Sequence, residues 1–275
     1  METKKFEKKK SLGQHFLTSN IVPKWMCDAA SIVAGDAVLE IGPGTGVLTK
    51  ELLSRGAQVI AIEADMRAIA VLHDSFETEI KEGTLVVHHI DAREMDLAHI
   101  PSISDHSFKV VANIPYYLSG FLFRGFLESK VQPSTLVFLV QKEVAKRITS
   151  SLERNEKESI LSLSVKAYGI PTYVKTVSKG HFTPPPKIDS AVIAIDKISR
   201  AHFIEMDIEE SFFFELLHIG FGQKRKQLLG NLSKRYDRDL LANIFSTLSI
   251  PVSTRAEDLT IEIWLKLTRA LSKLD

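Results

Sequence analysis

Short apolar runs recur between residues 37 and 140, and amphipathic segments separate most of them. The runs cover residues 37–41, 58–62, 85–88, 109–112 and 135–140. Apolar strands that alternate with amphipathic helices are typical of an α/β fold, in which helices cover both faces of a mostly parallel sheet. Ligands of such sheets bind at the carboxyl ends of the strands, so we look for chemistry directly after each run.

The pattern changes beyond residue 140. Residues 144–168 predict a helix, and residues 172–177 and 191–195 predict strands that complete the sheet, with the stiff Pro184-Pro-Pro186 loop between them. From Asp207 onward the pattern predicts only helices, near residues 211–219, 228–236, 239–248 and 259–271. We therefore expect one domain over residues 1–200 and a small all-helical domain over residues 201–275.

Composition limits the class of protein. The 275 residues are 44% hydrophobic, which is enough for a sizeable core. No stretch approaches the roughly 18 apolar residues of a membrane helix, and the lysine-rich start lacks the apolar core of a signal peptide, so we expect a cytoplasmic protein. The single cysteine, Cys27, excludes an intramolecular disulfide framework and a cysteine-based metal cluster, and we expect no metal site.

The net charge is only +1, so a nucleic-acid partner has to be inferred from the distribution of charge. Basic residues gather in the first ten positions, in Gly222-Gln-Lys-Arg-Lys226 and at Lys234-Arg235. A basic run by itself most often marks a solvated face. These segments therefore become candidates for RNA binding only through the motifs that follow.

A glycine-rich segment, Glu40-Ile-Gly-Pro-Gly-Thr-Gly46, follows the first predicted strand and opens a helix predicted over residues 47–54. Such glycines let the backbone approach a nucleoside closely, although an ordinary tight turn would use them too. A dinucleotide loop needs the spacing G-x-G-x-x-G, but position 47 is Val. The loop around Gly42 and Gly44 therefore favours a ligand without phosphates.

Acidic residues end the next two predicted strands. Glu63 lies about 20 residues after the glycine loop, where a carboxylate can accept hydrogen bonds from both ribose hydroxyls. Asp91 follows the third strand and could accept one from an adenine amine. Each could also be a solvated strand-end acid, but together with the glycine loop they predict an adenosine site.

The segment Asn113-Ile-Pro-Tyr-Tyr117 follows the fourth predicted strand and faces the same crevice. The exocyclic amine of a base is a poor nucleophile because its lone pair is delocalised. Acceptors for both amine hydrogens, here the Asn113 side chain and the Ile114 carbonyl, favour the pyramidal geometry that directs the lone pair at a methyl group. Pro115 keeps Ile114 extended or turned. Tyr116 offers a stacking face worth about 1–3 kcal/mol, although a turn that covers the core would also suit this sequence.

These segments closely resemble the KsgA-type rRNA adenine N6-dimethyltransferases, and the match covers nearly the whole chain. The matching motifs are Lys10-Ser-Leu-Gly-Gln-His-Phe-Leu17, Glu40-Ile-Gly-Pro-Gly-Thr-Gly46, Asn113-Ile-Pro-Tyr116, Val140-Gln-Lys-Glu-Val-Ala145, Phe182-Thr-Pro-Pro-Pro-Lys-Ile-Asp-Ser190, Phe221-Gly-Gln-Lys-Arg-Lys226 and Arg255-Ala-Glu257. The resemblance implies a Rossmann-like class I methyltransferase sheet and S-adenosylmethionine as the cofactor. It also implies a target, two adjacent adenosines in a loop near the 3′ end of small-subunit (16S) rRNA, each methylated twice during ribosome biogenesis.

The resemblance also implies a role for each matching residue. His15 and Leu17 would close over the cofactor, Gly42 would approach its amino-acid moiety, Glu63 would hold the ribose and Asp91 the adenine. Asn113 would meet both cofactor and target, and Tyr116 and Phe182 would sandwich the target base, although core packing is the competing interpretation of Phe182. His15 stands where many members have Asn. Because both side chains can donate to a carboxylate, we expect binding to survive with some pH dependence.

The target amine must come from a loop or be flipped out of its stack. We expect Lys224, Arg225 and Lys226, together with the lysine-rich start, to grip the flanking phosphates, so that binding weakens with salt. We expect a monomer acting on the small ribosomal subunit. No heptad pattern or extra strand demands a partner.

Two other functions use the same motifs. A related enzyme modifies large-subunit rRNA and confers antibiotic resistance, but the segment from Phe182 to Ser190 argues for the small subunit. A non-catalytic RNA-binding assembly or transcription factor on this fold would not need the amine acceptors, which are present here. An additional role in subunit assembly stays open.

Overall fold

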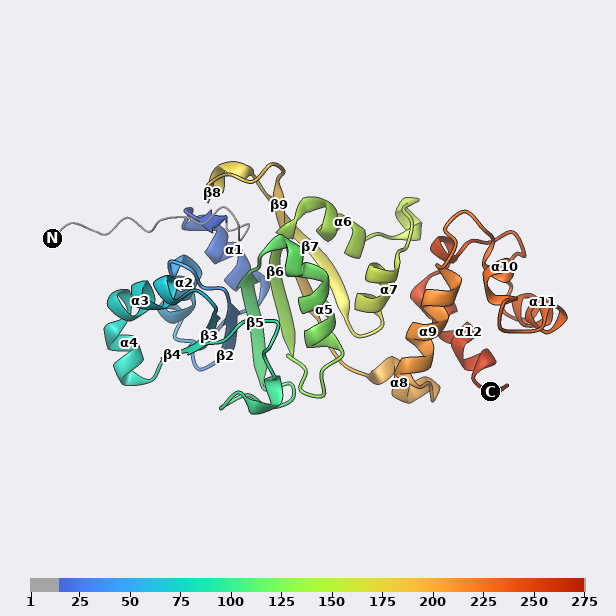
Figure 1. The fold of residues 1–275 in the computed structure, drawn as a ribbon, viewed down its shortest axis with the longest axis horizontal. Coiled ribbons are helices and arrows are strands. Elements are labelled where there is room, and N and C mark those ends of the chain that lie inside the picture. Colours follow the sequence, from blue (N-terminus) through green and yellow to red (C-terminus); the bar gives the residue numbers. More distant parts are fainter. Residues whose placement is uncertain (1–14, 275) are drawn as a thin grey trace. The chain divides into compact units, whose positions relative to one another are not determined.

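The computed structural model describes residues 15–274, and its main feature is a seven-stranded sheet (Figure 1). The strand order is β4-β3-β2-β5-β6-β9-β7. Strands β2 to β6 pair in parallel, and β9 pairs antiparallel with β6. The expected α/β fold is confirmed. The strands of this sheet are β2 (Ala37–Ile41), β3 (Gln58–Glu63), β4 (Leu85–His89), β5 (Phe108–Asn113), β6 (Thr135–Gln141), β7 (Ile170–Val177) and β9 (Ser190–Asp196).

Helices bury both faces of the sheet. The helices around it include α1 (Ile21–Ala29), α2 (Val47–Ser54), α3 (Met66–Ser75), α4 (Glu77–Glu82) and α5 (Ser119–Leu127). On one face, Met26 of α1 shares a buried cluster with Val137 of β6. On the other, Phe123 and Phe126 of α5 contact Phe138 at ring-centroid distances of 5.1 and 6.0 Å. Val137 and Phe138 are neighbours in β6, so the alternation of the strand sends them to opposite faces.

A separate strand pair lies beside the sheet. β1 (Phe16–Leu17) pairs antiparallel with β8 (Phe182–Thr183). Both the backbone N–H and the hydroxyl of Thr18 donate to the His181 carbonyl, at 2.9 and 3.1 Å. The sequence pattern missed this pair because strands of two residues show no periodicity. Its consequence is that the chain just before α1 is tied to the segment before β9.

The chain divides into two compact units. The first contains the sheet and runs to Ala145, with Pro171–Ile198 added; the second comprises Lys146–Ile170 and the chain from Ser199 onward. The sequence pattern placed residues 146–170 with the sheet, whereas they pack with the C-terminal helices. The helix expected over residues 144–168 is also interrupted. It consists of α6 (Lys142–Ile148), the 3-10 turn η4 (Leu152–Arg154) and α7 (Ile160–Lys166).

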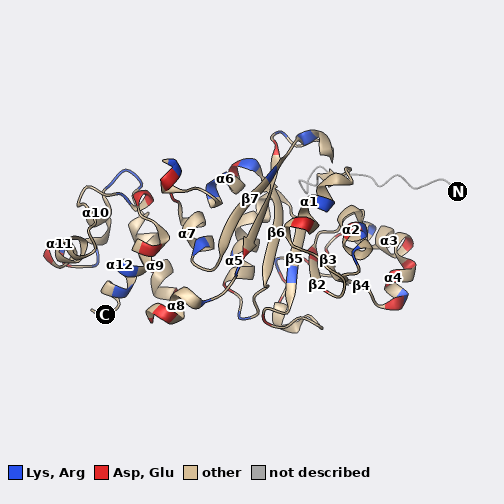
Figure 2. Cartoon of the chain, turned by 180° about the vertical axis from the view of Figure 1, so that it is seen from behind, with Lys and Arg blue, Asp and Glu red and all other residues tan. Residues whose placement is uncertain are grey.

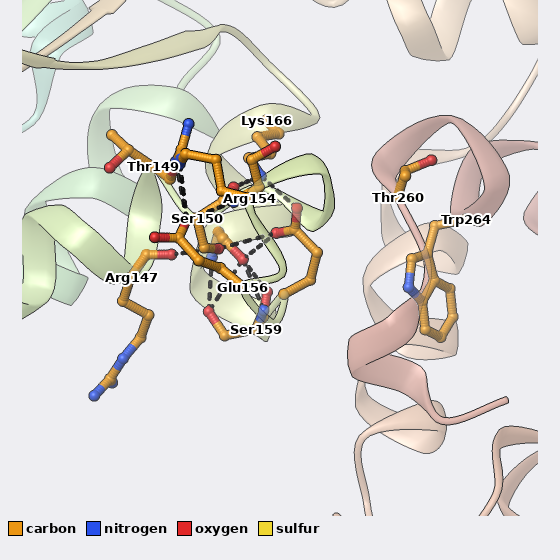
Figure 3. A network of polar contacts seen from close by, with 12 residues as sticks. Arg147, Thr149, Ser150, Arg154, Glu156, Ser159, Lys166, Thr260 and Trp264 are labelled. Carbon is orange, nitrogen blue, oxygen red and sulfur yellow. Dashed lines mark hydrogen bonds and ion pairs between the residues drawn. The ribbon is translucent and has the colours of Figure 1, made fainter.

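That interruption has a local cause. Asn155 adopts a left-handed backbone conformation, with φ +57°, which ends η4. Ser159 and Ser162 then form a capping box that starts α7. A polar network that includes Ser150, Ser159 and Lys166 fixes the connection (Figure 3). Glu158 is buried, accepts from Ser162 Oγ at 2.6 Å and pairs with Lys166, which also donates to the Ser150 carbonyl at 2.5 Å.

The C-terminal part of the second unit is helical, as expected. Its helices are α8 (Ala201–Met206), α9 (Glu210–Gly220), α10 (Leu228–Leu232), α11 (Arg238–Thr247) and α12 (Ile261–Leu271). α8 begins before the first helix that the pattern predicted. Phe203 of α8 packs on Tyr168 and Phe213, at ring-centroid distances of 5.3 and 5.5 Å. Within residues 15–274, no helix is long and apolar enough to cross a membrane.

Candidate active site

The glycine loop joins β2 to α2 at the carboxyl end of the sheet. Gly42, Gly44 and Gly46 have φ angles of +65°, +58° and +82°, which glycine adopts without strain. A Cβ atom at Gly46 would lie 2.4 Å from the Phe76 ring, and one at Gly44 would lie 3.1 Å from the Phe16 ring. At Gly42 the nearest atom would be 4.0 Å away. Gly42 is therefore the point at which a ligand can reach the backbone.

Glu63, the last residue of β3, holds its carboxylate against the glycine loop. Oε2 accepts from the backbone N–H of Gly44 at 3.1 Å, and Oε1 accepts from those of Ala64 and Asp65, both at 2.9 Å. Burial raises the pKa of Glu63, although these three bonds act in the opposite direction. Because a carboxylate has about four lone-pair sites, about one remains for a ligand hydroxyl.

Asp91 and Glu63 line a cavity of about 300 Å³ whose remaining wall includes Ile41, Ile62 and Leu118. The Asp91 carboxylate lies 2.5 Å from the Arg93 guanidinium. The hydrogen bond from Arg93 holds the pKa of Asp91 below its usual range. An ionised carboxylate therefore lines a pocket with both apolar and polar walls, which is the environment that a nucleoside requires.

A second buried carboxyl, that of Glu40 in β2, was not anticipated from the sequence. Glu40 is 1% exposed and accepts a hydrogen bond from Thr49 Oγ1 of α2 at 2.7 Å. Burial raises the pKa of Glu40 from 4.5 to about 8, and the nearby charge of Glu63 adds to this effect. Together with Gly42 and Asn113, Glu40 lines a small hollow. The sequence signal that could have identified Glu40 is an acidic residue inside an otherwise apolar predicted strand.

Asn113 ends β5 and contacts the chain just before β1. Its amide Nδ2 donates to the His15 carbonyl at 3.4 Å. A second cavity, of about 80 Å³, brings Asn113, Ile114, Pro115 and Tyr116 together with Gly42 and Glu63. The donor side of the Asn113 amide is thus turned toward His15, which leaves its oxygen on the other side as an acceptor.

Tyr116 is anchored at both ends. Its hydroxyl shares a 2.7 Å hydrogen bond with Ser190 Oγ, and its carbonyl accepts from Ser119 Oγ at 2.8 Å. Burial raises the pKa of Tyr116, so its phenol stays neutral. The His15 ring stacks on the Tyr116 ring, with centroids 5.6 Å apart and planes at 28°. His15 Nδ1 also lies 2.8 Å from the Pro184 carbonyl oxygen.

Two of the expected residues lie in the core. Phe182 is 3% exposed and belongs to the apolar cluster around α1, and Leu17, its register partner in β1, is 5% exposed. Neither lines the cavity that contains Tyr116, but Leu17 lines the small hollow that Glu40 shares with Gly42 and Asn113. The structure therefore brings His15, rather than Phe182, onto the ring of Tyr116.

The expected RNA-binding residues belong to the second unit. Lys224, Arg225 and Lys226 are exposed in the loop between α9 and α10, where Figure 2 shows basic residues in blue. Asn231 fixes this loop by donating to the carbonyls of Gly220 and Gln223, at 2.6 and 3.2 Å. The basic residues of the start, Lys4, Lys5, Lys8, Lys9 and Lys10, lie outside the described residues. Within residues 15–274, no group of three or more His, Cys, Asp or Glu side chains could hold a metal ion.

The fold is that of a class I methyltransferase. The family model described as ribosomal RNA adenine dimethylase matches residues 5–273, and the chain belongs to this family. The resemblance seen in the sequence is confirmed, and so is the expectation of an rRNA-methylating enzyme.

Known proteins agree with this assignment. A ribosomal RNA small subunit methyltransferase A from Dehalococcoides mccartyi is 38% identical over 269 residues, 97% of this chain and 89% of the relative. A dimethyladenosine transferase from Plasmodium falciparum has a TM-score of 0.76 at 26% identity, covering 92% of this chain and 96% of that one. The 23S rRNA methyltransferase ErmE has a TM-score of 0.71 at 22% identity, with coverages of 94% and 99%, and shows the fold alone.

Proposed function

We propose that this protein transfers methyl groups from S-adenosylmethionine to the N6 amines of two adjacent adenosines near the 3′ end of small-subunit rRNA, each methylated twice. The names of the curated relatives support the small subunit as the target. The observation that carries the proposal is the cavity in which Asn113, Ile114 and Tyr116 meet Gly42 and Glu63. The enzyme would thereby contribute to ribosome biogenesis in the cytoplasm.

The residues fit S-adenosylmethionine. The Asp91 carboxylate can accept from the adenine amine and Glu63 from a ribose hydroxyl, while Gly42 leaves room for the amino-acid moiety. Burial raises the pKa of both Glu40 and Glu63, and a cationic ligand beside them would act in the opposite direction and favour their ionised forms. When bound, the cofactor supplies an electrophilic methyl group on a positively charged sulfur.

Asn113 and Ile114 would prepare the amine. The Asn113 oxygen and the Ile114 carbonyl accept its two hydrogens, which favours a pyramidal nitrogen and directs its lone pair at the methyl group. No strong general base is required, because the amine becomes acidic only as the methyl arrives. The Asn113–His15 contact helps to set the amide orientation that this chemistry needs.

Tyr116 would hold the target base by stacking, a contact worth about 1–3 kcal/mol. The Ser190 hydrogen bond fixes its ring for this purpose. Because the His15 ring lies on Tyr116 in this structure, the base takes that face after His15 moves aside. Phe182 is buried, so a sandwich that includes Phe182 would require it to leave the core.

RNA would be gripped from the second unit as well. Lys224, Arg225 and Lys226 carry three positive charges on one exposed loop, which suits the phosphates that flank the target adenosines. We infer that the enzyme acts as a monomer on the small ribosomal subunit.

The test is methyl transfer from radiolabelled S-adenosylmethionine to small ribosomal subunits that lack the modification. We expect label in N6,N6-dimethyladenosine with the wild type and a loss of about 10²- to 10³-fold in kcat for Asn113→Ala, the size seen when one preorganised polar contact to a transition state is removed. Asn243→Ala, an exposed position in α11, is the matched control. Label on large subunits instead would support the resistance-type enzyme. Cofactor binding without label on either subunit would support a non-catalytic factor.

A further inference from the structure

The backbones of three lysines, Lys142, Lys179 and Lys187, come close to Asp189 in the first unit. The Asp189 carbonyl accepts from the backbone N–H of Lys142, the first residue of α6, at 3.0 Å. The Asp189 side chain accepts from the backbone N–H of Lys179, at the start of the 3-10 turn η5 (Lys179–His181), at 3.2 Å. Lys187 lies two residues before Asp189 in the proline-rich loop. We refer to Lys142, Lys179 and Lys187 as the lysine rim.

The lysine rim is not neutralised by ion pairs. None of its three side chains pairs with a carboxylate among the described residues, and Lys179 and Lys187 are exposed. By contrast, Lys109 in the same unit pairs with Asp36 at 2.8 Å. Figure 2 shows basic residues at the start of α6 and in the connection that follows β7. Three lysines near the single carboxylate of Asp189 leave an excess of positive charge, which indicates an anionic partner.

The position of the lysine rim relates it to the candidate active site. Asp189 is followed by Ser190, whose hydroxyl holds the Tyr116 phenol at 2.7 Å. Leu139 of β6 is the register partner of Asn113, and Lys142 follows three residues later. At about 3.3 Å per strand residue, and with β6 ending at Gln141, the backbone of Lys142 lies no more than about 10 Å beyond that partner, on the side of the carboxyl ends. A nucleotide with its base on Tyr116 would have its backbone within reach of these side chains.

We propose that the lysine rim is a phosphate-binding site of the first unit, which holds the RNA backbone beside the nucleotide whose base stacks on Tyr116. This inference rests on the proposed function. Taking a base out of its stack costs a few kcal/mol, and contacts to the flanking phosphates offset part of that cost and fix the register of the strand. Lysines suit this role because a point charge on a flexible stem can follow a backbone of irregular shape.

The experiment compares two triple variants of the full chain. The first changes Lys142, Lys179 and Lys187 to Gln. The second, of equal charge change, alters three exposed lysines elsewhere in the unit: Lys50, Lys81 and Lys130. Lys130 precedes β6 whereas Lys142 follows it, so these two lysines lie at opposite ends of one strand. The measurements are binding of a small-subunit rRNA transcript at several salt concentrations, KM and kcat for unmodified small subunits, and cofactor affinity by calorimetry.

We expect the rim variant to bind the transcript at least tenfold more weakly and to show a salt slope, d log K/d log[salt], less steep by about 2, since each phosphate contact contributes about 0.7 to 0.9. KM for small subunits should rise while kcat and cofactor affinity stay unchanged. A salt slope equal to that of the control triple overturns the proposal, as does a loss of cofactor affinity in the rim variant. Failure of the wild type to methylate small subunits would refute the proposed function instead, and the transcript-binding slopes would still decide the lysine rim.

Discussion

Replacement of Glu40 by Gln tests the electrostatics of the buried site. In the folded protein, burial raises the pKa of the Glu40 carboxyl from 4.5 to about 8. Between these pH values the native state retains a proton that the unfolded chain has released, so the stability of the wild type falls as pH rises through this window. Each pH unit corresponds to about 1.4 kcal/mol. The free energy of unfolding can therefore fall by at most about 5 kcal/mol between pH 4.5 and 8.

The Gln variant isolates the charge. Gln cannot ionise, but its oxygen can still accept the Thr49 hydrogen bond that Glu40 accepts at 2.7 Å. We expect the two proteins to differ little in free energy of unfolding below pH 4.5, and the variant to become more stable by a few kcal/mol by pH 8. The difference should then level off. Urea unfolding followed by circular dichroism at half-unit steps from pH 4 to 9 measures it.

Glu94→Gln, an exposed carboxyl in the same unit, is the control and should show no comparable trend. The Glu63 carboxyl is present in wild type and variant alike, so its own titration largely cancels in the difference. A difference in unfolding free energy that stayed constant from pH 4 to 9 would refute the reasoning. It would mean that Glu40 is ionised in the native state at neutral pH.

Two further changes test the geometry of the site. His15→Ala removes the ring that stacks on Tyr116 but keeps the carbonyl that Asn113 contacts. We therefore expect KM for RNA to fall by roughly two- to tenfold, the equivalent of one lost aromatic contact. Steady-state kinetics with small subunits measure this, and a rise in KM would mean that His15 helps to bind the target base. Gly46→Ala places a Cβ atom 2.4 Å from the Phe76 ring and also strains a backbone with φ +82°. Gly83→Ala, with φ +77° and no atom near the new Cβ, causes only the backbone strain of about 1 kcal/mol. Thermal melting should place Gly46→Ala well below Gly83→Ala, and equal melting temperatures would contradict the packing argument.

The sheet was predictable because both of its faces are buried. Strands such as β2 then read as continuous apolar runs, and the predicted limits 37–41 match the structure. The candidate site residues could then be sought directly after each strand, because the carboxyl ends of parallel strands share one edge of the sheet. The break at Asn155 was not predictable from apolar periodicity, because it depends on one left-handed residue and a serine cap.

The contacts made by β1 and β8 were also not predictable from the sequence. Neither two-residue strand has a period, and only their pairing carries His15 to Tyr116 and buries Phe182. The buried position of Phe182 illustrates why this pairing matters. The motif that contains it matches the family, but its position in the core is set by Leu17, which no local pattern links to it.

The carboxyls around the glycine loop give a physical reason for the spacing of its glycines. A dinucleotide loop must accept a pyrophosphate at the start of the helix that follows it. Here Glu63 already accepts the N–H of Gly44, and Glu40 lies two residues before the loop, tied to α2 through Thr49. A phosphate at that place would meet two buried acids and lose one of the N–H groups that should bind it. A cationic ligand would instead be attracted, and its charge would favour the ionised forms of both acids. The same residues that argue against a dinucleotide therefore support the proposal of a sulfonium cofactor, and they do so through charge as well as through spacing.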